Sequence, residues 1–216
     1  MTGKEIYRHS DASLKVLYRI LSAEFQDMAV TLRFDELNTP KTKDAVSEMY
    51  RRINVDVKQE YRKIARKVHR DTEDELGVPH ADFLPFAFVA GVLSRADPVT
   101  DYIYTHEWLR KRDRLVESLM AVHNRQELRD ALKRALDLMA NQVRQYADNI
   151  TDEARLEVFI AAGVERVKWI TQRDERVCPE CHARDGRIYR IQDIPDRHYR
   201  CRCYVVAADN SDEEEE

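Results

Sequence analysis

Cys178-Pro-Glu-Cys181 and His198-Tyr-Arg-Cys201-Arg-Cys203 are the two halves of the stretch that decides the C-terminal fold of this chain. All four cysteines lie in it, and none occurs before residue 178. Two cysteines at C-x-x-C spacing, followed by His-x-x-Cys, are typical of the ligands of a tetrahedral Zn²⁺ site. The sequence therefore predicts a small metal-binding module in this region.

More candidate ligands are present than one ion needs. Cys178, Cys181, His198 and Cys201 fit the pattern C-x₂-C-x₁₆-H-x₂-C. Cys203 can replace either member of the second pair, or one of these two residues can point into the core as a small apolar side chain. A site closed by four protein ligands is structural, whereas a catalytic site keeps one position open. We therefore expect one structural Zn²⁺ per chain, held by four of these five residues.

The expected cellular compartment favours metal binding by the cysteines over disulfide formation. No apolar run is long enough to span a membrane, and the N-terminus lacks a signal-peptide pattern. We expect synthesis in the cytosol, where thiols stay reduced.

The residues around the cysteines predict a small β unit. Alternating or β-prone patterns at 164–171, 187–191 and 203–207 indicate three short strands, and Asp185-Gly186 is a turn signal. The predicted β unit contains too few apolar residues to form a stable core alone. We therefore expect the metal to contribute folding free energy directly.

The rest of the chain predicts long helices. Of 216 residues 43% are hydrophobic and 35% are charged, and only 5 are Gly and 6 are Pro. Apolar steps of three and four residues indicate a helix over 10–25 and a very long one over 41–75, which begins after Asn38-Thr39-Pro40 and ends at Gly77. We expect the long helix to pack along its neighbours through one apolar stripe: Val46, Met49, Ile53, Val57, Tyr61, Ile64 and Val68. Its length also allows the alternative that it reaches toward another subunit.

Four more helices are expected, at 83–93, 99–121, 125–147 and 151–162. The first is apolar throughout and is predicted to be a buried core helix. Asp97-Pro98 is expected to mark the start of the next helix. Gly163 is a plausible C-cap of the last helix. The predicted fold class is thus mainly α: a long-helix N-terminal body with a small C-terminal α+β or β zinc-binding module. We expect the body to span 1–150, the module 151–208, and an acidic disordered tail 209–216.

Charge and motifs favour association over catalysis. The net charge of −4 comes from the six carboxylates of the tail, and the chain before it is slightly positive. The sequence has no Walker loop, no G-x-G-x-x-G, no G-x-S-x-G and no His-x-Glu of the zinc deaminases. We therefore predict no catalytic residue, no enzyme activity, no small-molecule substrate and no membrane contact.

The same residues carry a family resemblance. Val167-Lys-Trp-Ile-Thr-Gln-Arg-Asp174, followed by the C-x-x-C, the Asp185-Gly186 turn and His-x-x-Cys-Arg-Cys, resembles the C-terminal signature of phage head morphogenesis proteins, the Mu F-like minor head proteins. The likeness covers about 160–206, and a weaker one lies in 97–112. Two departures occur. The region 149–155 matches only loosely the Ala-Arg-Thr-Glu-like stretch of many members, and Tyr199 stands where the family usually has Pro.

The resemblance implies a structural and assembly role. A protein of this kind is a minor component of a tailed-phage head, acting in procapsid assembly or DNA packaging near the portal. Its implied partners are the portal and/or the major capsid protein, and possibly packaged DNA. Its implied location is the virion, after synthesis in the bacterial host cytoplasm. The alternative is a zinc-ribbon nucleic-acid-binding protein, although residues 173–203 carry a net charge of only +2, which is weak for binding duplex phosphates.

Overall fold

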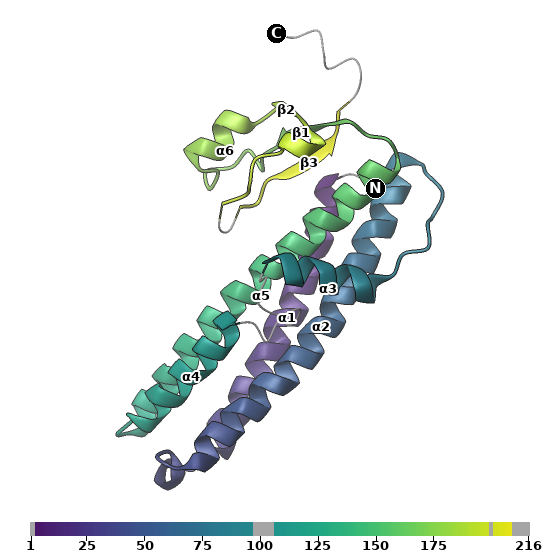
Figure 1. Cartoon of the computed structure of the whole chain (residues 1–216). Coiled ribbons are helices and arrows are strands. Elements are labelled where there is room, and N and C mark those ends of the chain that lie inside the picture. Colours follow the sequence, from purple (N-terminus) through teal and green to yellow (C-terminus); the bar gives the residue numbers. More distant parts are fainter. Residues whose placement is uncertain (1–2, 97–105, 199–200, 209–216) are drawn as a thin grey trace.

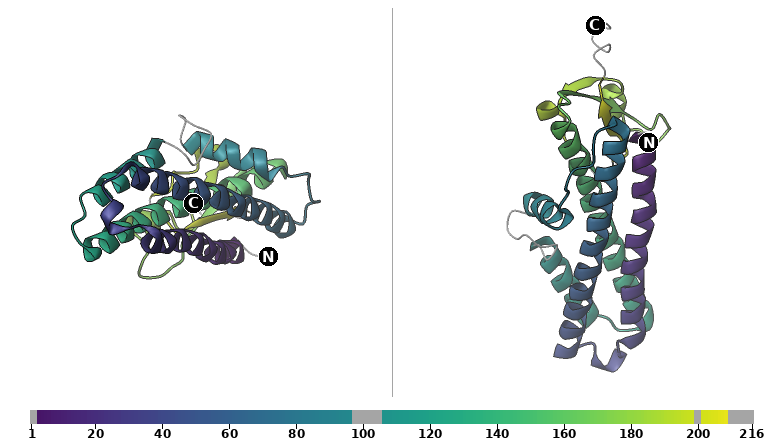
Figure 2. Two further views of the ribbon diagram at one scale, coloured as in Figure 1. Left: turned by 90° about the horizontal axis from the view of Figure 1, so that it is seen from below. Right: turned by 90° about the vertical axis from the view of Figure 1, so that its right-hand side faces the viewer.

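The structure, a computed structural model, describes residues 3–96, 106–198 and 201–208. Three long helices lie side by side in an elongated bundle: α1 (Gly3–Thr31), α2 (Pro40–Leu76) and α5 (Arg125–Ala161). A small sheet sits at one end of the bundle (Figure 1). Helix α1 runs away from the sheet, whereas α2 and α5 run towards it (Figure 2). The mainly α fold with a small C-terminal sheet is therefore confirmed.

Helix α2 confirms the long helix expected over 41–75. Pro40 lies in its first turn, where its missing amide hydrogen is not needed. Gly77 ends it at a φ of +66°, and the amides of Gly77 and Val78 donate to Asp74 and Glu73. Every residue of the predicted apolar stripe is buried against the neighbouring helices. The length of α2 is thus used for packing within the chain.

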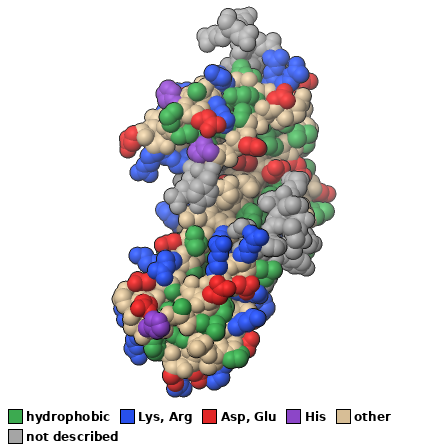
Figure 3. Space-filling model, turned by 60° about the vertical axis from the view of Figure 1, so that its left-hand side comes forward, with side chains coloured by type: hydrophobic (Ala, Val, Ile, Leu, Met, Phe, Trp, Pro, Cys, Tyr) green, Lys and Arg blue, Asp and Glu red, His purple; other side chains and the backbone are tan. Residues whose placement is uncertain are grey.

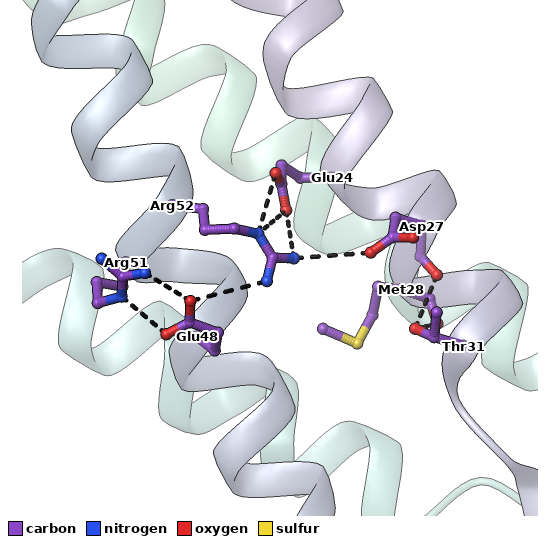
Figure 4. A network of polar contacts seen from close by, with 7 residues as sticks. All are labelled: Glu24, Asp27, Met28, Thr31, Glu48, Arg51 and Arg52. Atoms are coloured by element: carbon purple, nitrogen blue, oxygen red, sulfur yellow. Dashed lines mark hydrogen bonds and ion pairs between the residues drawn. The ribbon is translucent and has the colours of Figure 1, made fainter.

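A polar network joins α1 to α2 on the outside of the bundle (Figure 4). Arg52 donates to both carboxylate oxygens of Glu24, at 2.7–3.2 Å, and also approaches Asp27 and Glu48. The short 3₁₀ turn η1 (Phe34–Glu36) links the two helices. Surface pairs of this kind contribute little to stability, so the buried stripe carries most of the α1–α2 association.

Two shorter helices pack against the bundle. Helix α3 (Pro85–Ala96) buries Val89, Val92 and Leu93 but leaves Phe86 exposed, so it is a one-sided helix rather than the wholly buried one predicted. Helix α4 (His106–Met120) buries Leu115 and Leu119 against the bundle. The predicted restart at 97–98 and the start of the helix expected over 99–121 lie outside the described residues.

Helix α5 is continuous where two helices, 125–147 and 151–162, were predicted, and that prediction is wrong. The Thr151 hydroxyl donates to the carbonyl of Ala147 at 2.9 Å, which satisfies it inside the helix. Ile150 and Ala154 are fully buried and continue the apolar stripe across the expected break. The helix ends in a left-handed turn at Gly163, whose φ is +74°.

The sheet has three antiparallel strands in the order β2-β1-β3: β1 (Arg166–Ile170), β2 (Ile188–Arg190) and β3 (Tyr204–Ala207). All three lie where strands were predicted. The short helix α6 (Pro179–Arg184) and the 3₁₀ turn η2 (Ile191–Asp193) connect them, and Gly186 takes a φ of +79° at the predicted Asp-Gly turn.

The described residues form two clusters of buried apolar side chains that meet along α5. The larger fills the bundle and extends to Ala154. The smaller begins at Phe159, includes Val167 and Trp169, and contains three of the cysteines. One helix therefore belongs to both cores, and it carries the module on its C-terminal end.

Arg155 lies where these clusters meet, and it is completely buried. Its Nη1 donates to Glu75 of α2 at 2.8 Å, and its Nη2 donates to the carbonyl oxygen of Val205 in β3 at 3.1 Å. Its guanidinium also lies 5.0 Å from the centre of the Phe159 ring. A single side chain thus connects α2, α5 and the sheet.

Among the described residues, none of the helices combines the length and the apolar character needed to cross a membrane. The predicted acidic tail, 209–216, lies outside the described residues.

We predict that Arg155→Met lowers the free energy of unfolding by about 2–4 kcal/mol, because it leaves the Glu75 carboxylate and the Val205 carbonyl without a buried donor. The matched control is Arg134→Met, an exposed arginine of the same helix. Denaturant unfolding measures both changes. A loss for Arg155→Met as small as that of the control would show that this contact does not hold the module.

Candidate metal centre

The first two cysteines are positioned by the start of α6. Cys178 is the N-cap of this helix, and its Sγ accepts a hydrogen bond from the Cys181 amide at 3.3 Å. Pro179 follows at the first helical position, where its fixed φ suits the turn. The C-x-x-C spacing therefore places both sulfurs on the same side of one helical turn.

The other candidates come from the segment that leads into β3. The Cys201 amide donates to the carbonyl of His198 at 3.1 Å, which holds these two residues close together. Nε2 of His198 lies 3.2 Å from Sγ of Cys178 and 3.0 Å from Sγ of Cys181. Sγ of Cys201 lies 3.6 Å from Sγ of Cys181. The two halves of the sequence pattern thus meet, as the spacing predicts.

The five predicted residues form two overlapping groups, each with its ligand atoms within 4.8 Å of one another. Cys178, Cys181 and His198 make the first, and Cys181, Cys201 and Cys203 make the second. Ligand atoms around one tetrahedral Zn²⁺ lie roughly 3.5–3.8 Å apart, given bond lengths of about 2.0–2.3 Å. The separations of 3.0, 3.2 and 3.6 Å lie within that range or up to about 0.5 Å below it. Either group can hold a metal ion, and Cys181 is common to both.

The cluster is set into the smaller core. Cys181, Cys201 and Cys203 are buried beside Trp169, whose ring is fully enclosed, and Cys178 is half-buried at the edge. Metal would thus replace apolar packing that this short segment cannot supply, as expected of a structural site.

The environment splits the four thiols into two kinds. The Cys181 amide lowers the pKa of Cys178, and a hydrogen bond with Cys203 lowers the pKa of Cys201 to about 5. Burial raises the pKa of Cys181 to about 12, and the hydrogen bond with Cys201 raises the pKa of Cys203. Without a cation, therefore, the surroundings lower the pKa values of Cys178 and Cys201 and raise those of Cys181 and Cys203. A bound metal ion favours the thiolate at every sulfur that ligates it.

Salt bridges outside the cluster fix the loops that carry it. Arg202 donates to both oxygens of Asp174, at 2.5 and 2.7 Å, and this pairing lowers the pKa of Asp174. Asp185 accepts from the amide of Thr171 at 2.8 Å. Arg197, next to His198, pairs with an α5 carboxylate at 2.8 Å. These contacts tie the ligand loops to β1 and to the helical body.

Sequence reasoning found the five candidate ligands but missed the residues that hold them in place. In the sequence, Arg155 belongs to a stretch that matches the family only loosely. Asp174 and Arg202 occur as residues of the family signature, with no indication that they pair. Neither role has a spacing signal, because the partners of both arginines are distant in the chain.

Residues 111–206 match the model of the family described as Phage Mu protein F like protein. This region is Mu F-like. The match takes in most of α4, all of α5, the cysteine cluster and nearly all of the sheet, so it reaches further towards the N-terminus than the resemblance over 160–206. The weaker likeness in 97–112 falls almost entirely outside it. Searches of curated proteins and of solved structures gave no match.

We predict that Cys181→Ser opens the module while sparing the bundle, because this sulfur is shared by both groups. Limited proteolysis should then cleave after the helix end at Gly163, and circular dichroism should show little loss of helix. The control is His182→Ser, an exposed neighbour in the same helix that belongs to neither group. Equal protease resistance of the two variants and the wild type would contradict the prediction.

Proposed function

We propose that the chain is a minor head protein that works in phage head morphogenesis through association with other virion components. The observation that carries this proposal is the Mu F-like match over 111–206, which contains the cysteine cluster and the helix that supports it. The elongated bundle offers long helical surfaces for contact, and salt bridges hold the loops of the module at its end. Both features suit a protein that binds and positions its partners.

We further propose that the cluster holds one structural Zn²⁺. A nitrogen and several sulfur atoms in tetrahedral range are the donor set that Zn²⁺ prefers. Because Cys181 belongs to both groups, the two groups compete for it, which favours one ion over two. Cys178, Cys181 and His198 supply three ligands in this proposal.

Cys201 is proposed as the fourth ligand. Its sulfur already lies 3.6 Å from that of Cys181, and the Cys203 thiol is hydrogen-bonded to it. Cys203 would then support the ligand sulfur from behind, a role that a serine hydroxyl can also fill.

Metal analysis tests both parts. Protein purified without added metal should contain close to one zinc per chain. Cys203→Ser should keep that zinc, whereas Cys201→Ser should lose most of it. Wild-type protein with almost no zinc and freely reactive thiols would refute the metal proposal. Zinc that is retained by Cys201→Ser and lost by Cys203→Ser would show that Cys203, not Cys201, is the fourth ligand.

The partners we propose are the portal and/or the major capsid protein, with the virion as the location. The Arg110–Arg114 stretch of α4 and the outer face of α2 are candidate contact surfaces. In α4, Arg112 pairs with Asp113 and Lys111 donates to Gln142, so much of this charge is already used within the chain. On the face shown in Figure 3, acidic and basic side chains are interspersed along the bundle. Such a surface suits specific protein contacts better than a uniform electrostatic field does.

The alternative function, nucleic-acid binding by the module, has weaker support. Several of its arginines are paired with acidic residues, as in Arg202–Asp174, Arg173–Asp185 and Arg184–Glu180. Paired arginines release few counterions from DNA, so they add little affinity. Contact with packaged DNA is still compatible with a place in the head.

The head role predicts physical association. When the chain is produced together with the other head proteins of its phage, we expect it to co-sediment with portal-containing procapsids. Cys181→Ser should reduce this association, and His182→Ser should not. Protein that stays in the unassembled fraction at every stage, with normal particle yield in its absence, would refute the head role.

A further inference from the structure

An open groove lies between α3, the C-terminal part of α5 and the end of the sheet, with a volume of about 1210 Å³. Figure 1 shows α3 lying across the bundle below the sheet. One helical stripe of α5 lines the groove: Glu153, Leu156, Glu157 and Ile160. From α3 come Ala87, Phe88 and Gly91. This groove is separate from the cysteine cluster, and nothing in the proposed metal site or head role uses it.

Large apolar side chains are exposed beside and within this groove. Ile160, on its floor, is 62% exposed. Leu84 is 73% exposed, and its carbonyl accepts the amide hydrogen of Phe88, which places it at the start of α3. Leu84 directly precedes α3, three residues before Ala87 of the groove lining, so it lies next to the edge of the groove. Clustered exposure of this kind marks a protein interaction surface.

Gly91 leaves the backbone of α3 bare on this side. A Cβ at this position would meet no atom within 4 Å, so no packing inside the described chain requires a glycine. A glycine inside a helix lowers stability by roughly 0.5–1 kcal/mol relative to alanine. The bare backbone allows another chain to approach α3 closely.

The charges around the groove favour a second copy of the chain as its occupant. Glu157 lies on the helix side of the groove, whereas Arg166 and Arg190 lie on the sheet side together with Glu165, which directly precedes β1. Neither Glu157 nor Arg190 forms an ion pair with another described residue. In a twofold dimer each patch meets its own copy, so a patch of one sign would repel itself. A patch with acidic and basic sides can instead oppose unlike charges across the twofold axis.

We propose that this groove is the interface of a homodimer, in which Leu84 and the outer edge of α3 from each copy pack into the groove of the other. Fourteen residues line the groove, fewer than the 20–30 per side of a standard stable interface. The dimer should therefore be moderate in affinity, with a dissociation constant on the order of 1–10 µM. The proposal does not depend on the head role or on zinc.

Sedimentation velocity of the purified full chain, from about 0.5 to about 100 µM, tests it. The wild type should shift from monomer to dimer over this range. Ile160→Glu should weaken dimerisation at least tenfold by placing a charge on the groove floor. Ala87→Glu, which changes an exposed residue of α3, should do the same. The matched control is Leu138→Glu, a change at a 54% exposed aliphatic residue of the same helix, outside the groove. It should dimerise like the wild type.

Three results would overturn the proposal. The first is a wild type that stays monomeric throughout, which would assign the groove to a different partner. The second is a dimer that tolerates both groove variants. The third is a control that weakens dimerisation as much as the groove variants do. Helix content and thermal midpoint, measured for each variant, separate loss of the dimer from loss of the fold. Ala87→Glu keeps the test valid if Ile160→Glu proves unstable.

Discussion

The buried guanidinium of Arg155 is the contact on which the relation between the two cores depends. It joins the last turn of α2, through Glu75, to the backbone of β3, through Val205. Because a buried charge is tolerated only with good partners, the three elements can meet in few other ways. The Schellman-type end of α5 also restricts how the module is placed. The amide of Val164 donates to the carbonyl of Phe159, and this turn fixes the direction in which the chain enters β1. Together these contacts let a long helical body carry a very small sheet in a defined position.

The sheet itself has too little apolar material to account for its own order. Three strands of three to five residues pack on a few large side chains, with Trp169 at the centre and the cysteines beside it. A metal ion held by the cluster would link α6 to the segment that enters β3, which are the two parts of the module that share no strand pairing. The salt bridge between Asp174 and Arg202 spans the same two parts from outside. A metal held by the cluster would therefore complement this pair: the metal would close the inside of the module, and the salt bridge closes its surface.

Features that depend on neighbouring residues could be predicted from the sequence, whereas contacts between residues distant in the chain could not. The buried stripe from Val46 to Val68, the start of α2 at Pro40, its end at Gly77 and the three short strands were all predicted, because neighbouring residues determine each of them. The five candidate ligands that the structure brings together were predicted from ligand spacing alone. The break expected near residue 150 was wrong, since polar residues there are accommodated by a back-bond from Thr151 and by continued burial of Ile150. Helix α3 was read as wholly buried because its composition is apolar, yet composition does not say which face meets the bundle. Arg155 could not have been identified, because its partners lie 80 and 50 residues away.

The central claim is that a metal-closed module is held rigidly on the end of a helical body that folds without it. Amide hydrogen exchange of the purified chain, compared before and after removal of metal by a chelator, tests this claim most directly. The account predicts that the amides of β1, β2 and β3 lose protection when the metal is removed, while those of α2 and of α5 before Arg155 keep it. Equal protection of the strands in both samples, or loss of protection along α2 and α5 together with the sheet, would contradict it.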